Sequence, residues 1–152
     1  MRQAERLRYL VLAAQRDGNR RLSAELRPLG LTSSQAEVLR ILADHAPLTL
    51  SGLGRLLVCE SGENPSRLVD RLVVAGLVER MPHSTDRRLV AVSLTAAGHA
   101  LESRVRAIEE AMYEYIDAIT ADLDLEQVLT VLERLTAGGS AGAAVSLRAS
   151  AS

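Results

Sequence analysis

PSRLVDRLVVAGLVER, at residues 65–80, and DRRLVAVSLTAAG, at residues 86–98, are the two most informative segments of this chain. The first follows Asn64, and Asn followed by Pro is a favoured helix start, because Asn caps free backbone N–H groups and Pro lacks one. Its apolar residues recur at helical intervals: Leu68, Val69, Leu72 and Val73. The pattern predicts a helix from Asn64 to about Ala75, ended by Gly76.

A β-hairpin is predicted immediately after this helix. Residues 77–81 and 89–94 are strand-like runs that flank a polar loop at residues 82–88. The loop ends in Asp86, Arg87 and Arg88, so the hairpin has a charged tip. A helix followed by such a hairpin is the second half of a winged helix-turn-helix.

Helices are also predicted upstream of this unit. Residues 33–42 and 51–58 have apolar positions at helical spacing, and Thr32 or Ser33 is a suitable cap for the first of them. A longer helix is predicted over residues 3–26, with a weak point at Asp17-Gly18-Asn19.

Downstream, Thr95 is expected to cap a long helix that runs to about Thr120, and a further helix is expected over residues 123–135. Residues 137–152 are rich in small residues, which predicts a disordered tail.

The fold class is therefore predicted to be mainly α (α+β), a winged helix-turn-helix with long N- and C-terminal dimerisation helices. Four parts are expected. Residues 1–30 form an N-terminal dimerisation helix and residues 31–94 the DNA-binding region. Residues 95–136 form the C-terminal dimerisation helices, and residues 137–152 the tail.

Composition excludes several other classes of protein. The chain has 152 residues, of which 47% are hydrophobic, and this suits one ordinary domain. Aromatic residues make up only 2%, which disfavours a stacking platform for single-stranded nucleic acid. Its single cysteine, Cys59, excludes an intramolecular disulfide, and His45, His83 and His99 have no metal-ligand spacing with it or with one another. We expect no metal, no cofactor and no enzymatic activity, since no nucleophile and base are brought together.

The charge is distributed unevenly along the chain. The net charge is −1, yet residues 1–30 hold seven arginines against three acidic residues, and residues 89–152 hold four against nine. All eighteen basic residues are arginine, which suits bidentate recognition of phosphate or guanine but equally fits a genome rich in G and C. Neither the start of the chain nor any long apolar run resembles a signal peptide or a membrane span, so a cytoplasmic protein without membrane contact is expected.

The predicted helix at residues 64–75 is the candidate element for reading DNA. The exposed first residues of such a helix can meet bases or phosphates in the major groove. The contact candidates are Asn64, Ser66, Arg67 and Arg71. Each has an alternative role: Asn64 as a helix cap only, Ser66 as a solvated residue, and the arginines as partners in surface ion pairs such as Arg67 with Asp70.

The hairpin tip is the second candidate contact. Asp86 precedes two arginines, so its carboxylate is expected to hold one guanidinium while the tip presents the other, from Arg87 or Arg88, to a minor groove. Narrow A·T-rich minor grooves attract arginine. The alternative is a solvated turn with a local salt bridge.

Four blocks resemble the MarR family of bacterial transcription regulators: LTSSQAEVLRIL, LTLSGLGRLL, PSRLVDRLVVAGLVER and DRRLVAVSLTAAG. The resemblance implies a homodimer on a palindromic operator of double-stranded DNA, a recognition helix carrying Ser66 to Arg71, and insertion of Arg88 into the minor groove. It also implies release of DNA by small, often aromatic, effectors. One departure is a turn at residues 59–64 that is about two residues longer than usual and carries Glu60 and Glu63, which leaves the base-reading residues open.

The length of the C-terminal helix independently predicts dimerisation. From Thr95 to Thr120 it measures about 39 Å at about 1.5 Å per residue, longer than a small domain is wide. Its apolar seam would be wet in a monomer, and a two-fold dimer is the commonest way to cover it, although packing within the chain is an alternative. An effector pocket is expected where the first and the long helices meet the DNA-binding region, lined by Tyr9, Leu12, Met112 and Tyr113.

We therefore predict a sequence-specific DNA-binding transcriptional regulator, a repressor released by a small molecule. The alternative is a protein-binding helical dimer that uses its winged helix without DNA recognition. A role for Cys59 in sensing oxidants is a further hypothesis, and the alternative for this residue is a small buried side chain without redox function.

Overall fold

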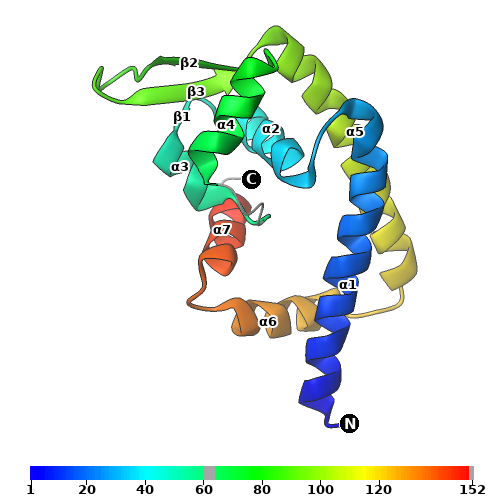
Figure 1. Ribbon diagram of the computed structural model, residues 1–152. Coiled ribbons are helices and arrows are strands. Elements are labelled where there is room, and N and C mark those ends of the chain that lie inside the picture. Colours follow the sequence, from blue (N-terminus) through cyan, green and yellow to red (C-terminus); the bar gives the residue numbers. More distant parts are fainter. Residues whose placement is uncertain (60–63, 151–152) are drawn as a thin grey trace.

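The computed structural model describes residues 1–59 and 64–150 as a mainly helical chain with a small sheet (Figure 1). The helices are α1 (Gln3–Leu26), α2 (Ser33–His45), α3 (Leu50–Leu56), α4 (Pro65–Val74), α5 (Ala96–Thr120), α6 (Leu125–Thr136) and α7 (Ser140–Ala149). A short 3-10 helix, Arg27–Leu29, follows α1. The strands are β1 (Leu48–Thr49), β2 (Val78–Pro82) and β3 (Val90–Leu94).

Two parts are evident in this arrangement (Figure 1). The winged helix lobe, residues 31–94, contains α2, α3, α4 and the sheet. The helical arm contains α1, α5 and α6; α1 packs on α5, α6 follows the end of α5 that lies away from the lobe, and the N-terminal turns of α1 extend beyond it (Figure 1). From there the chain returns to the lobe through α7, which packs on α3.

The core of the lobe is aliphatic, as the composition requires. Leu39 and Leu42 of α2 and Leu72 of α4 are almost completely buried. Val92 of β3 and Val105 of α5 join the same cluster, so the sheet and the base of the arm share one core with the helices. Burying each aliphatic side chain of this kind contributes roughly 1.5–3 kcal/mol.

Side-chain caps start three helices at the predicted places. Thr32 and Gln35 form a capping box at the start of α2. Asn64 caps α4, with Pro65 as the first helical residue. Thr95 caps α5 by accepting a hydrogen bond from the Gly98 N–H at 3.0 Å. These starts are local, because each needs only residues within one turn.

The sheet is antiparallel, with β3 in the middle and the order β1, β3, β2. In the hairpin, Val78 lies opposite Leu94 and Pro82 opposite Val90. This pairing puts the Asp86 to Arg88 loop at the tip of a wing that projects from the lobe (Figure 1). The predicted strands are therefore confirmed to within one residue.

A close approach joins the wing to the arm. The Thr95 hydroxyl donates to the Gly76 carbonyl at 2.7 Å, and the Thr95 N–H donates to the Leu77 carbonyl at 3.1 Å. A Cβ at Gly98 would lie 2.0 Å from the Leu77 oxygen. Only glycine fits there, so α5 leaves the sheet at a fixed angle.

The structure differs from two sequence expectations. α1 is continuous through Asp17-Gly18-Asn19, because one glycine costs only about 1 kcal/mol in a helix of 24 residues. The segment expected to be a disordered tail forms α7 instead, with Ala144 completely buried. Docking on the lobe supplies the stabilisation that its composition lacks, and residues 151–152 of the expected tail lie outside the described residues.

Candidate nucleic-acid interface

α4 lies on the surface of the winged helix lobe with a clear division between its two sides. Leu68, Val69 and Leu72 are buried in the core, whereas Arg67 and Arg71 are exposed. The helix is thus supported from beneath by aliphatic packing and presents arginine to solvent.

The first turn of α4 is held by Asn64. Its Oδ1 accepts a hydrogen bond from the Arg67 N–H at 2.9 Å, and the side chain remains exposed. Ser66, in the same turn, is also exposed. Asn64 therefore has the capping role, and its exposure leaves it accessible to a phosphate as well.

Asp70 forms its ion pair with Arg80 of β2, and not with Arg67 three residues earlier. This pairing corrects the simple ion-pair alternative for Arg67 that the spacing suggested. It also ties the exposed side of α4 to the first strand of the wing.

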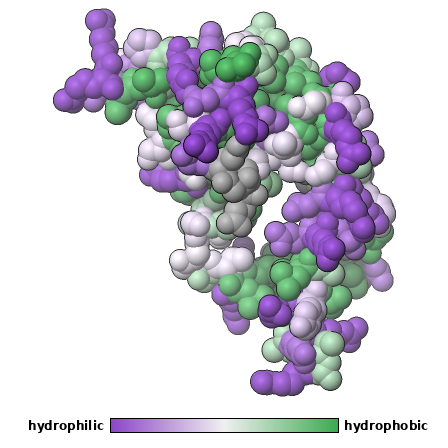
Figure 2. Space-filling view, in the orientation of Figure 1, coloured by the Kyte–Doolittle hydropathy of each residue, from purple (hydrophilic) through white to green (hydrophobic). Residues whose placement is uncertain are grey.

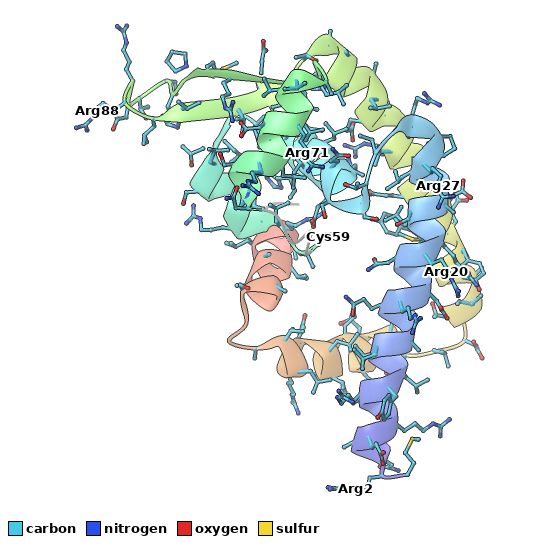
Figure 3. The ribbon with its side chains drawn as sticks, in the orientation of Figure 1. Arg2, Arg20, Arg27, Cys59, Arg71 and Arg88 are labelled. Carbon is cyan, nitrogen blue, oxygen red and sulfur yellow. The ribbon has the colours of Figure 1, made fainter. Side chains whose placement is uncertain are left out.

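Asp86 and Arg88 make a compact pair at the wing tip. The carboxylate accepts hydrogen bonds from the Arg88 backbone N–H at 3.0 Å and from Nε and Nη2 at 3.1 Å. These bonds, side chain first and backbone second, lower the pKa of Asp86 below its ordinary value of 3.8. The Arg88 side chain nevertheless stays 90% exposed, at the far end of the hairpin (Figure 3).

The lobe therefore carries exposed arginines on α4 and on the wing, where Arg87 is exposed beside Arg88, and a further one, Arg55, on α3. Figure 2 shows hydrophilic side chains gathered over α4 and over the wing tip. The lengthened turn falls mostly on residues 60–63, so Glu60 and Glu63 lie outside the described residues.

Known proteins resemble this chain over most of its length. A family model described as a winged helix DNA-binding domain matches residues 31–98. The multiple antibiotic resistance protein MarR of Escherichia coli K12 is 39% identical over 83 residues, which are 55% of this chain and 57% of that protein. Its counterpart in Salmonella typhimurium is 32% identical over 115 residues, 74% of this chain and 79% of that protein.

The chain belongs to the MarR family. A solved structure of an E. coli MarR cysteine-to-serine mutant complexed with operator DNA matches with a TM-score of 0.67 and 30% identity, covering 86% of this chain and 91% of that chain. Wild-type E. coli MarR in its apo form matches with a TM-score of 0.62. This MarR family member is a DNA-binding transcription regulator with a winged helix fold, as its sequence blocks predict.

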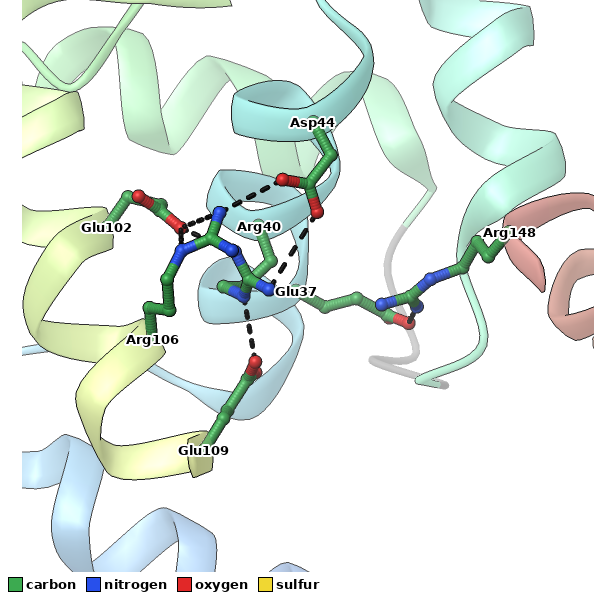
Figure 4. Close-up of polar contacts among 7 residues, drawn as sticks. All are labelled: Glu37, Arg40, Asp44, Glu102, Arg106, Glu109 and Arg148. Atoms are coloured by element: carbon green, nitrogen blue, oxygen red, sulfur yellow. Dashed lines mark hydrogen bonds and ion pairs between the residues drawn. The ribbon is translucent and has the colours of Figure 1, made fainter. Parts of the chain in front are cut away.

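Two buried carboxylates of this MarR family member were missed by reasoning from sequence. Glu37 of α2 accepts the backbone N–H groups of Val58 and Cys59 at 3.0 and 2.8 Å, and Arg148 donates to it from α7 at 2.8 Å (Figure 4). Glu37 lies four residues before buried Ile41 and so shares its face of α2, which is the one signal that could have found it.

The second carboxylate, Glu102 of α5, belongs to a network that joins lobe and arm. Arg40 of α2 pairs with Glu102 and with Glu109, and Arg106 pairs with Glu102 and with Asp44 (Figure 4). The network fixes α2 against α5, and this contact is one of those that join the arm to the lobe.

Cys59 lies beside Glu37 and is half-buried. Burial, followed by the negative charge of Glu37, raises the pKa of its thiol from 9.0 to about 11. Since the thiolate is the reactive form, this environment opposes oxidant sensing by Cys59.

An apolar pocket of about 430 Å³ lies between α1 and α5. Its lining residues are Arg21, Leu22, Glu25, Ala107, Ile108, Ala111, Met112 and Tyr115. Of the four residues predicted for an effector pocket, only Met112 lines it, whereas Tyr9, Leu12 and Tyr113 are exposed elsewhere on α1 and α5. Helical spacing could not place those three, because it does not determine which side of α1 meets which side of α5.

Neither a metal cluster nor a membrane span is found within residues 1–59 and 64–150. No three His, Cys, Asp or Glu side chains there are grouped to hold an ion. Similarly, no helix in this part of the chain combines the length and apolarity needed to cross a bilayer.

Proposed function

We propose that this protein is a homodimeric repressor that binds a palindromic operator in double-stranded DNA and is released by a small aromatic effector. It acts by binding alone, without catalysis, and in the cytoplasm where its DNA target is accessible. The family model describes residues 31–98 as DNA-binding, which favours this function over a winged helix that binds only protein.

α4 is the proposed major-groove element. Arg67 and Arg71 lie four residues apart on its exposed side, so one groove can receive both. Asn64 and Ser66 at its N-terminus are proposed to contact phosphate, toward which the free N–H groups of a helix start are directed.

The wing is the proposed minor-groove element. The observation that carries the proposal is that Arg88 is held by Asp86 and yet remains 90% exposed at the tip. A guanidinium restrained in this way loses less side-chain entropy on binding than an unrestrained one. Arg87, also exposed, is proposed to contact the adjacent phosphates.

The helical arm supports dimerisation. Large apolar side chains are exposed along all three of its helices: Tyr9, Leu10, Val11, Leu12, Tyr115, Ile116, Ile119, Val128, Leu129, Val131 and Leu135. Figure 2 shows apolar surface gathered around α6, where the arm ends. A patch of this kind marks an interface, and two-fold symmetry would let both α4 helices read half-sites about one turn of duplex apart.

Dimerisation is tested by sedimentation velocity. Ile119→Asp places a charge in this patch and is expected to produce monomers, because an unpaired charge is costly inside an apolar interface. Val74→Asp is the matched control, since Val74 is 89% exposed and lies on α4, outside this patch. A dimer that survives Ile119→Asp unchanged would argue against the arm as the interface.

The pocket between α1 and α5 is the proposed effector site. Its wall is mainly aliphatic, with Met112 and Tyr115 to contact a ring and Arg21 to pair with a carboxylate. The Arg21 guanidinium lies over the Tyr115 ring, 5.3 Å from its centroid. The cation that would pair with the carboxylate of an acidic ligand is therefore already held in place. A thermal-shift screen with small aromatic acids, repeated with Arg21→Ala, tests this site.

DNA binding is tested by fluorescence anisotropy on the region upstream of the protein's own gene. Arg67→Ala and Arg88→Ala are expected to weaken binding by roughly tenfold each, and removal of one neutralised phosphate lowers the magnitude of the salt slope by about 0.9. Arg20→Ala, on the exposed side of α1, removes the same charge and should bind like wild type. Unchanged binding by both lobe variants would overturn the assigned interface.

A further inference from the structure

The Glu37 carboxylate connects three parts of the chain that are distant in sequence. Its side chain is 8% exposed. It accepts hydrogen bonds from the backbone N–H groups of Val58 and Cys59 and from Nη1 of Arg148, and Figure 4 shows the Arg148 contact. Val58 and Cys59 follow α3 directly, and α4 begins at Pro65. The carboxylate therefore holds the beginning of the segment that leads into the proposed recognition helix.

A carboxylate in this position requires a cation. Removing an ionised carboxylate from water costs several kcal/mol unless it is paired and hydrogen-bonded. The two N–H donors satisfy its hydrogen-bonding capacity only in part, and Arg148 supplies the opposite charge. Without that charge the buried carboxylate is stabilised only by entry of water, and hydration of Glu37 weakens its hydrogen bonds to the Val58 and Cys59 N–H groups.

α7 is held near its start and at its middle, so the backbone position of Arg148 is well defined. At the start of α7, a Cβ at Gly142 would lie 2.4 Å from the Thr136 carbonyl, which makes the turn from α6 tight. Further along, Ala144 is completely buried, and the helix packs on α3. Arg148 lies one helical turn after Ala144. The packing of α7 therefore places its guanidinium beside Glu37.

We propose that Arg148 is a positioning residue for DNA recognition, which acts through Glu37 on the segment after α3 and so couples the C-terminal helix α7 to the placement of α4. This role rests on the proposed function of α4. It makes α7, expected from composition to be disordered, a further connection between the end of the arm and the lobe, in addition to the Arg40 network and the Thr95 junction.

The first test compares DNA affinity and its salt dependence. Arg148→Ala is expected to weaken binding on the order of tenfold, within the usual range of coupling between sites, while the slope against salt stays that of wild type. Arg148→Lys should recover most of the affinity, because the ammonium restores the charge beside Glu37. Arg134→Ala, an exposed arginine on α6, is the matched control and should bind like wild type.

The second test needs no DNA and separates this proposal from the proposed function. In the DNA-free dimer, Arg148→Ala should speed hydrogen exchange at the Val58 and Cys59 amides and in the first turn of α4, whereas Arg134→Ala should not. Circular dichroism and sedimentation establish that each variant is a folded dimer. If Arg148→Ala does not fold, Arg148→Met takes its place, because it removes the charge and keeps an apolar side chain of similar length.

Three results would overturn the role of Arg148. One is equal exchange at Val58 and Cys59 in wild type and Arg148→Ala. Another is equal DNA affinity in Arg148→Ala and Arg134→Ala. The last is a salt slope reduced in Arg148→Ala, which would mean that Arg148 contacts phosphate directly. If wild type binds no operator fragment while the exchange difference is present, the proposed function fails and the coupling stands.

Discussion

Arg40 of α2 and Glu102 of α5 form an ion pair in which the two side chains are 13% and 7% exposed. The same guanidinium bonds Glu109 through Nε at 2.8 Å, and Arg106 donates to Glu102 through Nε at 3.0 Å. Two cations thus share the carboxylates on α5, with Asp44 as a further partner. Because α2 belongs to the lobe and α5 to the arm, this network fixes the position of the lobe, with its proposed DNA-binding surface, relative to the helical arm.

Arg40→Ala is expected to destabilise the protein by about 2–4 kcal/mol, since it removes the cation that pairs with the largely buried Glu109 and leaves the buried Glu102 with Arg106 alone. Urea unfolding at one fixed protomer concentration measures the change. Arg104→Ala, at an exposed position of α5, should cost less than about 0.5 kcal/mol. Equal losses in the two variants would mean that the network adds nothing beyond an ordinary surface arginine.

Gly98→Ala is expected to cost about 1–3 kcal/mol, because its Cβ would lie 2.0 Å from the Leu77 carbonyl oxygen and α5 would have to shift. Gly18→Ala provides the opposite case. It lies in the middle of α1 with nothing within 4 Å of the new Cβ, so alanine should stabilise by about 0.5–1 kcal/mol. The pair is compared by the same urea titration, and changes of the same sign would contradict a steric requirement for glycine at the junction.

The Asp86 carboxyl is expected to titrate with a pKa below 3.8 in the folded protein, because Arg88 bonds its charged form. A lowered pKa means that the contribution of this pair is present above the ordinary value and is lost as the pH falls through the lowered one. Carbon NMR of the side-chain carboxyl measures the titration directly. Arg88→Ala should move the midpoint back toward 3.8 and Arg87→Ala should leave it, so an identical response would show that Arg88 is not the cause.

Cys59 is expected to resist alkylation near neutral pH and to react faster as the pH rises toward its thiol pKa of about 11. A raised thiol pKa contributes stability that is complete below pH 9.0 and is lost as the pH climbs through the raised value. Iodoacetamide labelling followed by mass spectrometry gives the rate, with urea-unfolded protein as the control. Native labelling as fast as that of the unfolded chain at about pH 8 would restore the oxidant-sensing hypothesis, as would DNA release on peroxide treatment that Cys59→Ser abolishes.

Much of the lobe could be predicted from local patterns in the chain. The cap at Asn64, the stop at Gly76 and the strands around the wing each depend on residues within a few positions of one another. The spacing of apolar residues likewise predicts which side of α4 is buried and which is exposed, because it too depends only on residues a few positions apart. The exposed candidates for DNA contact, from Asn64 to Arg88, therefore follow from sequence, whereas their contacts with DNA stay a prediction.

Partners of the charged residues, by contrast, depend on the tertiary structure alone. Asp70 pairs with Arg80 and not with Arg67, and Glu37 meets Arg148 across 111 positions of the chain. Neither pairing has a local signature, because an arginine reaches any carboxylate that the fold brings near it. The helical state of residues 140–149 has the same origin. Their small side chains stabilise an isolated helix too little to order it, and the burial of Ala144 and the ion pair of Arg148 with Glu37 supply the missing stabilisation.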